Sequence, residues 1–225
     1  MTLENNFIKH SKEYIFSDNK ILSNQRETAF KKIFQKNYDK KNNESLKHIT
    51  ISDLSNFDYL YKPENEDSKV STIDKYNYEI KLVNGICKHY EDEYIEIRNL
   101  TNLDFKTFLN QDNNNLDDII IDFNKIFLNS GIFFNIKSEA KLNIRLIHET
   151  SDNFTIFQNN FINFKKKCEV KLEDNFNLTN NSISNINYNI NIEEDATVKH
   201  NIFQNFANSN KLYLTSNTVC EKNSS

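Results

Sequence analysis

The sequence predicts a mainly β protein, a parallel β-solenoid of about 28 residues per coil that follows an α-helical N-terminal region. Three observations lead to this prediction. Helix signals dominate residues 1–62, and residues 112–131 repeat apolar side chains at helical spacing. After Gly131 apolar and polar residues alternate, as in a strand with one buried face. The alternating segments then recur every 28 residues.

The first segment, residues 1–62, is predicted to be a helical arm. Asn24 fits a helix N-cap because Glu27 follows three residues later. Weaker helical patterns occur at 7–15 and 54–61. Residues 63–76 hold the only proline and many charges, so we expect a linker there. The apolar stripe of the main helix consists of Ala29, Phe30, Ile33 and Phe34.

Residues 77–131 are predicted to be a mixed α/β lead-in that ends in an amphipathic helix. A strand over 78–82 leads into Asn84-Gly85, a strong hairpin-turn signal, and residues 94–97 are the expected return strand. We expect Gly131 to end the helix in the left-handed conformation. The apolar stripe of that helix is Leu116, Ile119, Ile120, Phe123, Ile126 and Phe127.

Residues 132–225 are predicted to be the β-coils, and the last of them is apparently truncated. Three apolar-Asn-apolar triplets start the repeat, at 134–136, 162–164 and 190–192. Four residues after the last apolar residue of each triplet comes a small residue. Two further positions, two and four residues after the small residue, also recur every 28 residues. The side chains predicted to stack inside successive coils are Ile136, Leu142, Phe164, Val170, Ile192 and Val198. The matched sets are Ala140, Cys168 and Ala196, then Leu142, Val170 and Val198, then Ile144, Leu172 and His200.

Composition excludes several classes of protein. The formal net charge of −4 lacks the basic footprint of a general nucleic-acid binder. No stretch approaches the roughly 20 apolar residues of a membrane span, and residues 1–20 lack a secretory h-region. The three cysteines are far apart, which fits a reducing compartment better than a disulfide framework. The 39 asparagines beside 18 phenylalanines and 2 glycines indicate a biased composition that can still bury a core.

The sequence contains only weak signals for a metal-binding or catalytic site. Cys87 and His89, with Glu91 and Glu93 nearby, could ligate a metal, but no second Cys/His pair completes a site. We therefore expect an ordinary strand or loop there. The chain lacks the glycines of a phosphate-binding loop, and no nucleophile–base arrangement stands out.

The cysteine, histidine and charged residues of the coils are also expected to have structural roles. Cys168 occupies a slot held elsewhere by alanine, so we expect a small buried side chain. His200 is expected to be a hydrogen-bonded interior histidine. Cys220 lies too near the end of the sequence for its surroundings to be predicted. The charged runs at 165–167 and 193–195 precede equivalent slots and are expected to form a solvated outer corner.

The order of these segments resembles one known family. The segments are Asn24-Gln-Arg26-Glu-Thr-Ala29-Phe30, the stretch 47–54, the strand ending at Asn84-Gly85, the helix at 123–127, and coils such as Glu-Asp-Ala196-Thr-Val198-Lys-His200. In this order they resemble the SufB/SufD family of iron–sulfur cluster assembly proteins, and most of all the N-terminal portion of SufD. The resemblance implies a right-handed parallel β-helix between helical regions.

The resemblance also implies a function. A SufD-like chain would be a non-catalytic scaffold subunit of the cytoplasmic SUF system, with SufB-like and SufC-like subunits as partners and neither nucleic acid nor membrane. The Cys and His residues implicated in cluster building lie in later coils of the family. No catalytic, cofactor-binding or metal residue is therefore assigned here, and we expect a cluster only in the full complex. The alternatives are a β-helix carbohydrate-active enzyme and a solenoid that binds proteins.

Overall fold

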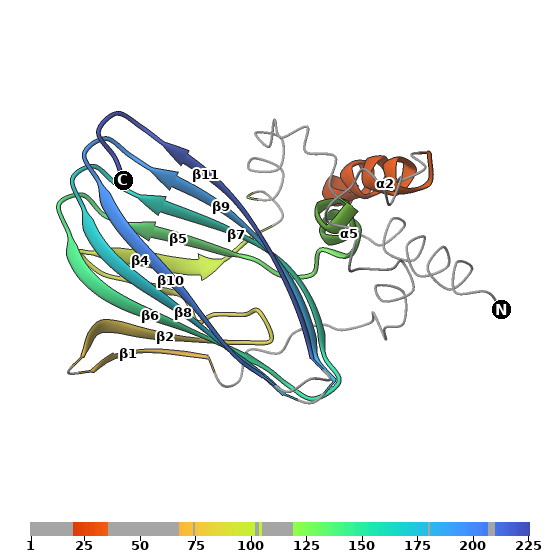
Figure 1. The fold of residues 1–225 in the computed structure, drawn as a ribbon, viewed down its shortest axis with the longest axis horizontal. Coiled ribbons are helices and arrows are strands. Elements are labelled where there is room, and N and C mark those ends of the chain that lie inside the picture. Colours follow the sequence, from red (N-terminus) through yellow and green to blue (C-terminus); the bar gives the residue numbers. More distant parts are fainter. Residues whose placement is uncertain are drawn as a thin grey trace. The chain divides into compact units, whose positions relative to one another are not determined.

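A computed structural model describes residues 20–35, 68–73, 75–101, 104, 119–179, 181–206 and 210–225. Over these residues the protein is mainly β, with two helices and two mixed sheets (Figure 1). The chain divides into two compact units. Residues 1–61 and 100–128 form the first unit, which contains the two described helices, and residues 62–99 and 129–225 form the second, which contains the described strands.

The helical unit contains α2 (Lys20–Gln35) and α5 (Ile119–Phe127). One face of each helix is apolar and buried, as the sequence pattern predicts. Arg26 is buried too, and its guanidinium donates a hydrogen bond of 2.8 Å to the Leu128 carbonyl. The buried apolar side chains are Leu22, Ala29 and Ile33 of α2 and Ile120, Phe123, Ile126 and Phe127 of α5.

Both predicted helix boundaries differ from the structure. Asn24 lies inside α2, and its carbonyl accepts a hydrogen bond from the Thr28 hydroxyl, so Asn24 is not the N-cap. Helix α5 ends at Phe127, and Gly131 has no positive φ because the chain is already entering the strand at 132. The expected start of this helix and the weaker patterns at 7–15 and 54–61 lie outside the described residues.

The first sheet has the strand order β1-β2-β6-β8-β10. Strand β1 pairs antiparallel with β2, and the other pairs are parallel. The strands are β1 (Lys69–Ile73), β2 (Tyr76–Val83), β6 (Lys141–Thr150), β8 (Glu169–Leu178) and β10 (Thr197–Phe206).

The second sheet has the order β11-β9-β7-β5-β4-β3. Here β3, β4 and β5 pair antiparallel, and β5, β7, β9 and β11 pair in parallel. The strands are β3 (Tyr90–Glu91), β4 (Ile95–Asn99), β5 (Ile132–Ile136), β7 (Thr155–Phe164), β9 (Ile183–Ile192) and β11 (Lys211–Cys220).

Successive parallel strands of the repeat are offset by one constant spacing within each sheet. Leu142 pairs with Val170 and Val170 with Val198 in the first sheet. In the second sheet Ile136 pairs with Phe164, and Phe164 with Ile192. Of the side chains predicted to stack inside, all are buried except Val198, which is partly buried against the same core. The predicted spacing and the predicted inward residues are therefore confirmed.

The structure differs from two expectations for the residues before the coils. Strand β1 lies within 63–76, where the sequence suggested a linker, and it pairs with β2 at the edge of the first sheet. The turn at Asn84-Gly85 exists, with φ of 50° and 80°. However, β2 pairs in parallel with β6, and β4 lies in the other sheet, so 94–97 is not a return strand.

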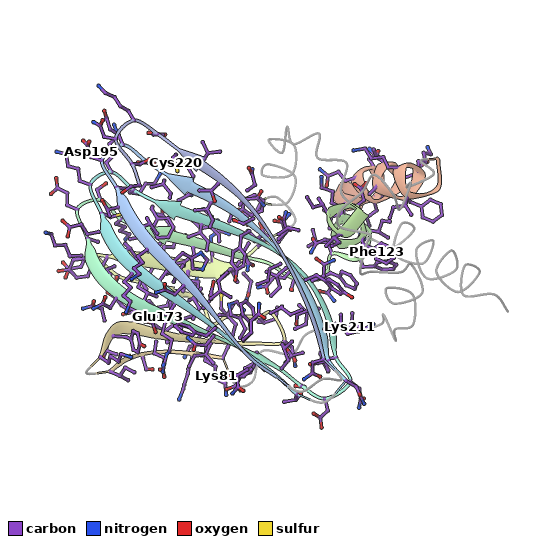
Figure 2. The ribbon with its side chains drawn as sticks, viewed as in Figure 1. Lys81, Phe123, Glu173, Asp195, Lys211 and Cys220 are labelled. Atoms are coloured by element: carbon purple, nitrogen blue, oxygen red, sulfur yellow. The ribbon has the colours of Figure 1, made fainter. Side chains whose placement is uncertain are left out.

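Residues with positive φ mark the corners at the spacing of the repeat. At one corner they are Glu139, Lys167, Asp195 and Asn223, with φ of 62°, 60°, 59° and 58°. At another they are Asn153 and Asn181, with φ of 61° and 55°. Non-glycine residues thus adopt the left-handed conformation at matched positions of the repeat. Figure 2 shows Asp195 at its corner.

Candidate functional site

The most distinctive polar group of the β unit is a buried carboxylate held between two imidazoles. Asp174 lies on β8, His148 on β6 and His200 on β10. The His148 Nε2 atom is 3.0 Å from Oδ1 of Asp174, and the His200 Nε2 atom is 2.7 Å from Oδ2. Because an ionised carboxylate only accepts hydrogen bonds, each Nε2 donates to its own oxygen.

The strand register explains why these three side chains meet. Asp174 pairs with Leu146 on β6 and with Ile202 on β10. His148 is two residues beyond Leu146, and His200 is two residues before Ile202. Residues two apart on a strand share a face of the sheet, so both histidines reach Asp174 diagonally from the neighbouring strands.

Asp174 is fully buried, so its protonation state depends on the groups that contact it. The side chain of Asp174 is 0% exposed, against 5% for His148 and 19% for His200. Burial by itself would raise the pKa of Asp174, but the hydrogen bonds from His148 and His200 outweigh it and hold that pKa well below its usual range. Asp174 is therefore an ionised carboxylate inside the sheet stack.

The opposite sheet contributes an aromatic contact to this cluster. The Tyr188 hydroxyl on β9 lies 3.5 Å from Nε2 of His148, and the Tyr188 ring meets the His200 ring edge-on at 5.9 Å. Burial, together with the charge of Asp174, raises the pKa of Tyr188 well above its ordinary value. Phe176 stacks on His148 with ring centroids 4.3 Å apart. The cluster thus joins three strands of one sheet to a strand of the other.

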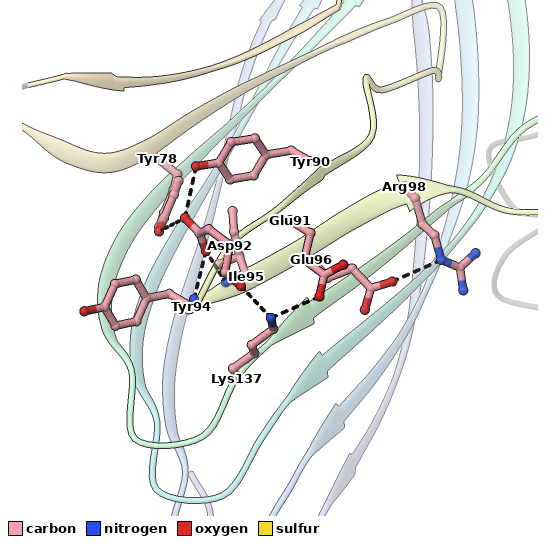
Figure 3. A network of polar contacts seen from close by, with 9 residues as sticks. All are labelled: Tyr78, Tyr90, Glu91, Asp92, Tyr94, Ile95, Glu96, Arg98 and Lys137. Carbon is pink, nitrogen blue, oxygen red and sulfur yellow. Dashed lines mark hydrogen bonds and ion pairs between the residues drawn. The ribbon is translucent and has the colours of Figure 1, made fainter.

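A second polar cluster closes the turn between β3 and β4 (Figure 3). The Oδ2 atom of Asp92 accepts hydrogen bonds from the hydroxyls of Tyr78, at 2.6 Å, and Tyr90, at 3.0 Å. Its Oδ1 atom accepts from the backbone N–H groups of Tyr94 and Ile95. Burial opposes ionisation of Asp92, but these bonds prevail and lower its pKa.

Lys137 attaches this turn to the end of β5. Its Nζ atom lies 2.5 Å from the Asp92 carbonyl and 3.1 Å from Oε1 of Glu91 (Figure 3). Burial and the bond to Asp92 raise the pKa of Tyr78, so its hydroxyl stays a hydrogen-bond donor. All these contacts fix one turn against its neighbouring strands, which is a structural role.

The structure does not assemble the weak metal candidate around Cys87. Cys87 lies in the apolar core, where burial raises the pKa of its thiol to about 12. His89, Glu91 and Glu93 are exposed, and Glu91 pairs with Lys137. Over the described ranges, no group of three or more His, Cys, Asp or Glu side chains could hold a metal ion.

The structural interpretations of Cys168 and His200 are confirmed. Cys168 is 0% exposed in the same core as Ala140 and Ala196, and burial raises the pKa of its thiol to about 11. His200 is the hydrogen-bonded interior histidine that the sequence suggested. Cys220, whose surroundings the sequence left open, is exposed on β11 (Figure 2).

The charged corner is also found where the sequence placed it. Lys165 and Glu193 form an ion pair of 2.6 Å, and Lys166 lies 3.6 Å from Glu194. Each pair joins equivalent positions of successive repeats. These side chains are half-buried or exposed, as expected of a solvated corner.

Sequence reasoning missed Asp174 and His148. A signal for both was present in the repeat. Asp174 aligns with Leu146 and Ile202, and His148 aligns with Phe176. A titratable residue at an inward position that is apolar in the neighbouring repeats indicates a buried polar contact. Two such residues on neighbouring strands indicate that they contact each other.

No protein-family model, curated protein or solved structure matches the chain. Among the helices that the structure describes, none is long and apolar enough to cross a membrane.

Proposed function

We propose that this chain is a SufD-like scaffold subunit of the SUF iron–sulfur cluster assembly system, acting in the cytoplasm with SufB-like and SufC-like subunits. The observation that carries the proposal is the constant parallel register, in which each residue pairs with the residue one repeat of 28 later on the neighbouring strand. This register holds in β6, β8 and β10 and in β5, β7, β9 and β11. This register follows a helical region and a short mixed lead-in, the order that resembles SufD.

The proposal includes a more specific fold. The two sheets would be the faces of a right-handed parallel β-helix, in which each repeat contributes one strand to each sheet. The strand pairs support this reading because each ten-residue strand, β6 to β11, pairs with a strand one repeat of 28 residues away. The matched left-handed corners support it as well, since a coil must turn at the same place in each repeat.

A scaffold role fits the chemistry of the described side chains. The buried thiols of Cys87 and Cys168 have raised pKa values, which disfavours the reactive thiolate. The inward positions are mostly apolar and stack strand upon strand. In this proposal the chain is not an enzyme, and an iron–sulfur cluster forms only in the full complex.

Co-expression tests the proposal. The full chain, carrying an affinity tag, is produced with the SufB-like and SufC-like proteins of the same genome, and complexes are sized by light scattering after gel filtration. We expect a stable complex that contains all three proteins. A tagged β-helix protein of unrelated function is the control for non-specific capture.

Two results would contradict the proposal. A folded chain that binds neither SUF protein would exclude a SufD-like role, and hydrolysis of a polysaccharide would favour the carbohydrate-active alternative. Anaerobic reconstitution adds a second measurement. The isolated chain should take up no stoichiometric iron or sulfide, whereas its complex should, and a reproducible cluster on the chain alone would overturn the scaffold role.

A further inference from the structure

We propose that Asn84 is a site of spontaneous deamidation and that its contacts with Ser151 restrain the reaction in the folded protein. The reaction consumes one molecule of water, converts the side-chain amide of Asn84 into a carboxylate and releases ammonia. This inference is independent of the SUF proposal, because it depends only on one turn of the β unit.

The chemistry joins the side chain of Asn84 to the backbone of the next residue. The backbone nitrogen of Gly85 loses its proton and attacks Cγ of Asn84. The new N–Cγ bond closes a five-membered imide, the Cγ–Nδ2 bond breaks, and Nδ2 leaves as ammonia. Water then opens the imide: attack at Cγ gives aspartate, and attack at the backbone carbonyl carbon gives isoaspartate. Glycine has no side chain to hinder the first attack, so a following glycine favours the reaction.

The fold itself requires this reactive pair. Gly85 has a φ of 80°, and a Cβ atom there would lie 2.5 Å from Oγ of Ser130, so a larger residue does not fit. Asn84 has a φ of 50°, which asparagine tolerates better than most residues that carry a side chain. The sequence contains no other Asn-Gly pair. A chemically labile pair therefore lies where the backbone geometry favours exactly these two residues.

The end of β6 holds the side chain of Asn84 in place. Nδ2 of Asn84 donates to Oγ of Ser151 at 3.0 Å, and the Ser151 N–H donates to Oδ1 at 2.8 Å. The Asn84 N–H donates to the Glu149 carbonyl at 2.8 Å, and Asn84 as a whole is only 7% exposed. Imide formation expels Nδ2 and moves Oδ1 together with Cγ, so both contacts with Ser151 must break first. These contacts therefore slow the reaction in the folded protein.

The two products affect the turn differently. In aspartate an oxygen replaces Nδ2, and the Ser151 hydroxyl can rotate to donate to it while the Ser151 N–H still donates to the other oxygen. Isoaspartate instead routes the main chain through Cβ and Cγ. The longer main chain cannot keep the bond to Glu149 and the contacts with Ser151 together, so this product detaches the end of β2 from the end of β6.

Mass spectrometry of one peptide measures the reaction. The full chain is incubated at pH 8 and 37 °C, either folded or in guanidinium chloride, and then cleaved with trypsin. The peptide 82–88 contains Asn84 and no other asparagine. Its aspartate and isoaspartate forms separate by chromatography. We expect deamidation of this peptide to be at least about tenfold slower in the folded protein than in the unfolded one. Ser151→Ala removes the hydroxyl that holds Nδ2, so deamidation of its folded form should be faster than that of the wild type.

The control is Ser138→Ala, at an exposed serine of a corner, which should leave the folded rate unchanged. An intact peptide in the unfolded protein would overturn the assignment of the site. Equal rates in the folded wild type and folded Ser151→Ala would overturn the restraining role of Ser151. If Ser151→Ala does not fold, the wild type decides, because equal rates in its folded and unfolded forms would overturn the proposal.

Urea denaturation of two variants tests the accommodation of the product. Asn84→Asp should unfold at nearly the same urea concentration as the wild type, because the contacts with Ser151 are kept. Asn84→Ala loses both contacts and should unfold at a lower concentration. Equal losses in the two variants would contradict the accommodation of an aspartate at this turn.

Discussion

The Nζ atom of Lys165 lies 2.6 Å from Oε1 of Glu193, one repeat of 28 residues later in the sequence. The two residues follow equivalent strands, β7 and β9, which pair in parallel. The same offset separates the paired residues inside the sheets, for example Val170 and Val198. One spacing therefore governs both the core and the charged corner, and several predictions rest on it.

Lys167→Gly should stabilise the protein. Lys167 has a φ of 60°, which costs a residue with a side chain but not glycine, so we expect the free energy of unfolding to rise by about 1 kcal/mol. Urea denaturation measures the change. Ser138→Gly, at the residue before the positive-φ position of the preceding corner, is the matched control and should be destabilising. A loss of stability in Lys167→Gly would show that the corner is not strained.

Val170→Asp should unfold or severely destabilise the chain. Val170 is 4% exposed and pairs with Leu142 and Val198, so the substitution buries an unpaired carboxylate at a cost of about 3 kcal/mol or more. Circular dichroism and urea denaturation follow the effect. Asn143→Asp places the same carboxylate at an exposed position of the neighbouring strand and should be nearly neutral. Similar stability of the two variants would contradict the inward placement of Val170.

Asp174→Asn should remove a pH-dependent part of the stability. The pKa of Asp174 is lower in the folded protein than the ordinary value of about 3.9. Its carboxylate therefore contributes stability above roughly pH 4, and this contribution is lost as the pH falls through the lower folded pKa. We expect Asp174→Asn to lower the free energy of unfolding by about 2 kcal/mol at pH 7 and by less below pH 4.

Urea denaturation between pH 3 and 7 tests this expectation, with Asp152→Asn as the control at an exposed carboxylate. A difference between wild type and Asp174→Asn that stays constant over the whole range would mean that the charge of Asp174 does not contribute. The loss of stability in Asp174→Asn would then come from the changed shape and hydrogen bonding of the side chain alone.

The three thiols should differ in reactivity. Burial raises the pKa of Cys87 to about 12 and that of Cys168 to about 11, so at pH 8 few of these thiols are thiolates, and both are shielded from reagents. Cys220 is exposed. Alkylation by iodoacetamide, followed by mass spectrometry, should modify Cys220 first by at least about tenfold, and denaturation should abolish the difference. Equal rates in the folded protein would place Cys168 at the surface.

In the lead-in, the sequence pattern predicts the strands and the turn correctly but not the pairing of the strands. Alternation in 78–82 and 95–97 correctly indicates two strands, and Asn84-Gly85 correctly indicates a turn. A φ of 80° suits Gly85, and a Cβ atom there would lie 2.5 Å from Oγ of Ser130, so glycine is required. Nevertheless the strands belong to different sheets, because β2 finds its partner in β6, far later in the sequence.

The sequence by itself determined the period, the inward residues and the charged corner of the β unit. A constant repeat combined with alternation specifies both the spacing of equivalent positions and the face on which each side chain lies, as Val170 and Cys168 show. The tertiary structure alone decided that β1 becomes an edge strand, that β2 joins β6, and that Asp174 lies between His148 and His200. Alternation states which face a residue occupies but not which strand lies beside it. The contact of Asp174 with residues 26 positions away on either side arises only when three strands stack in one register.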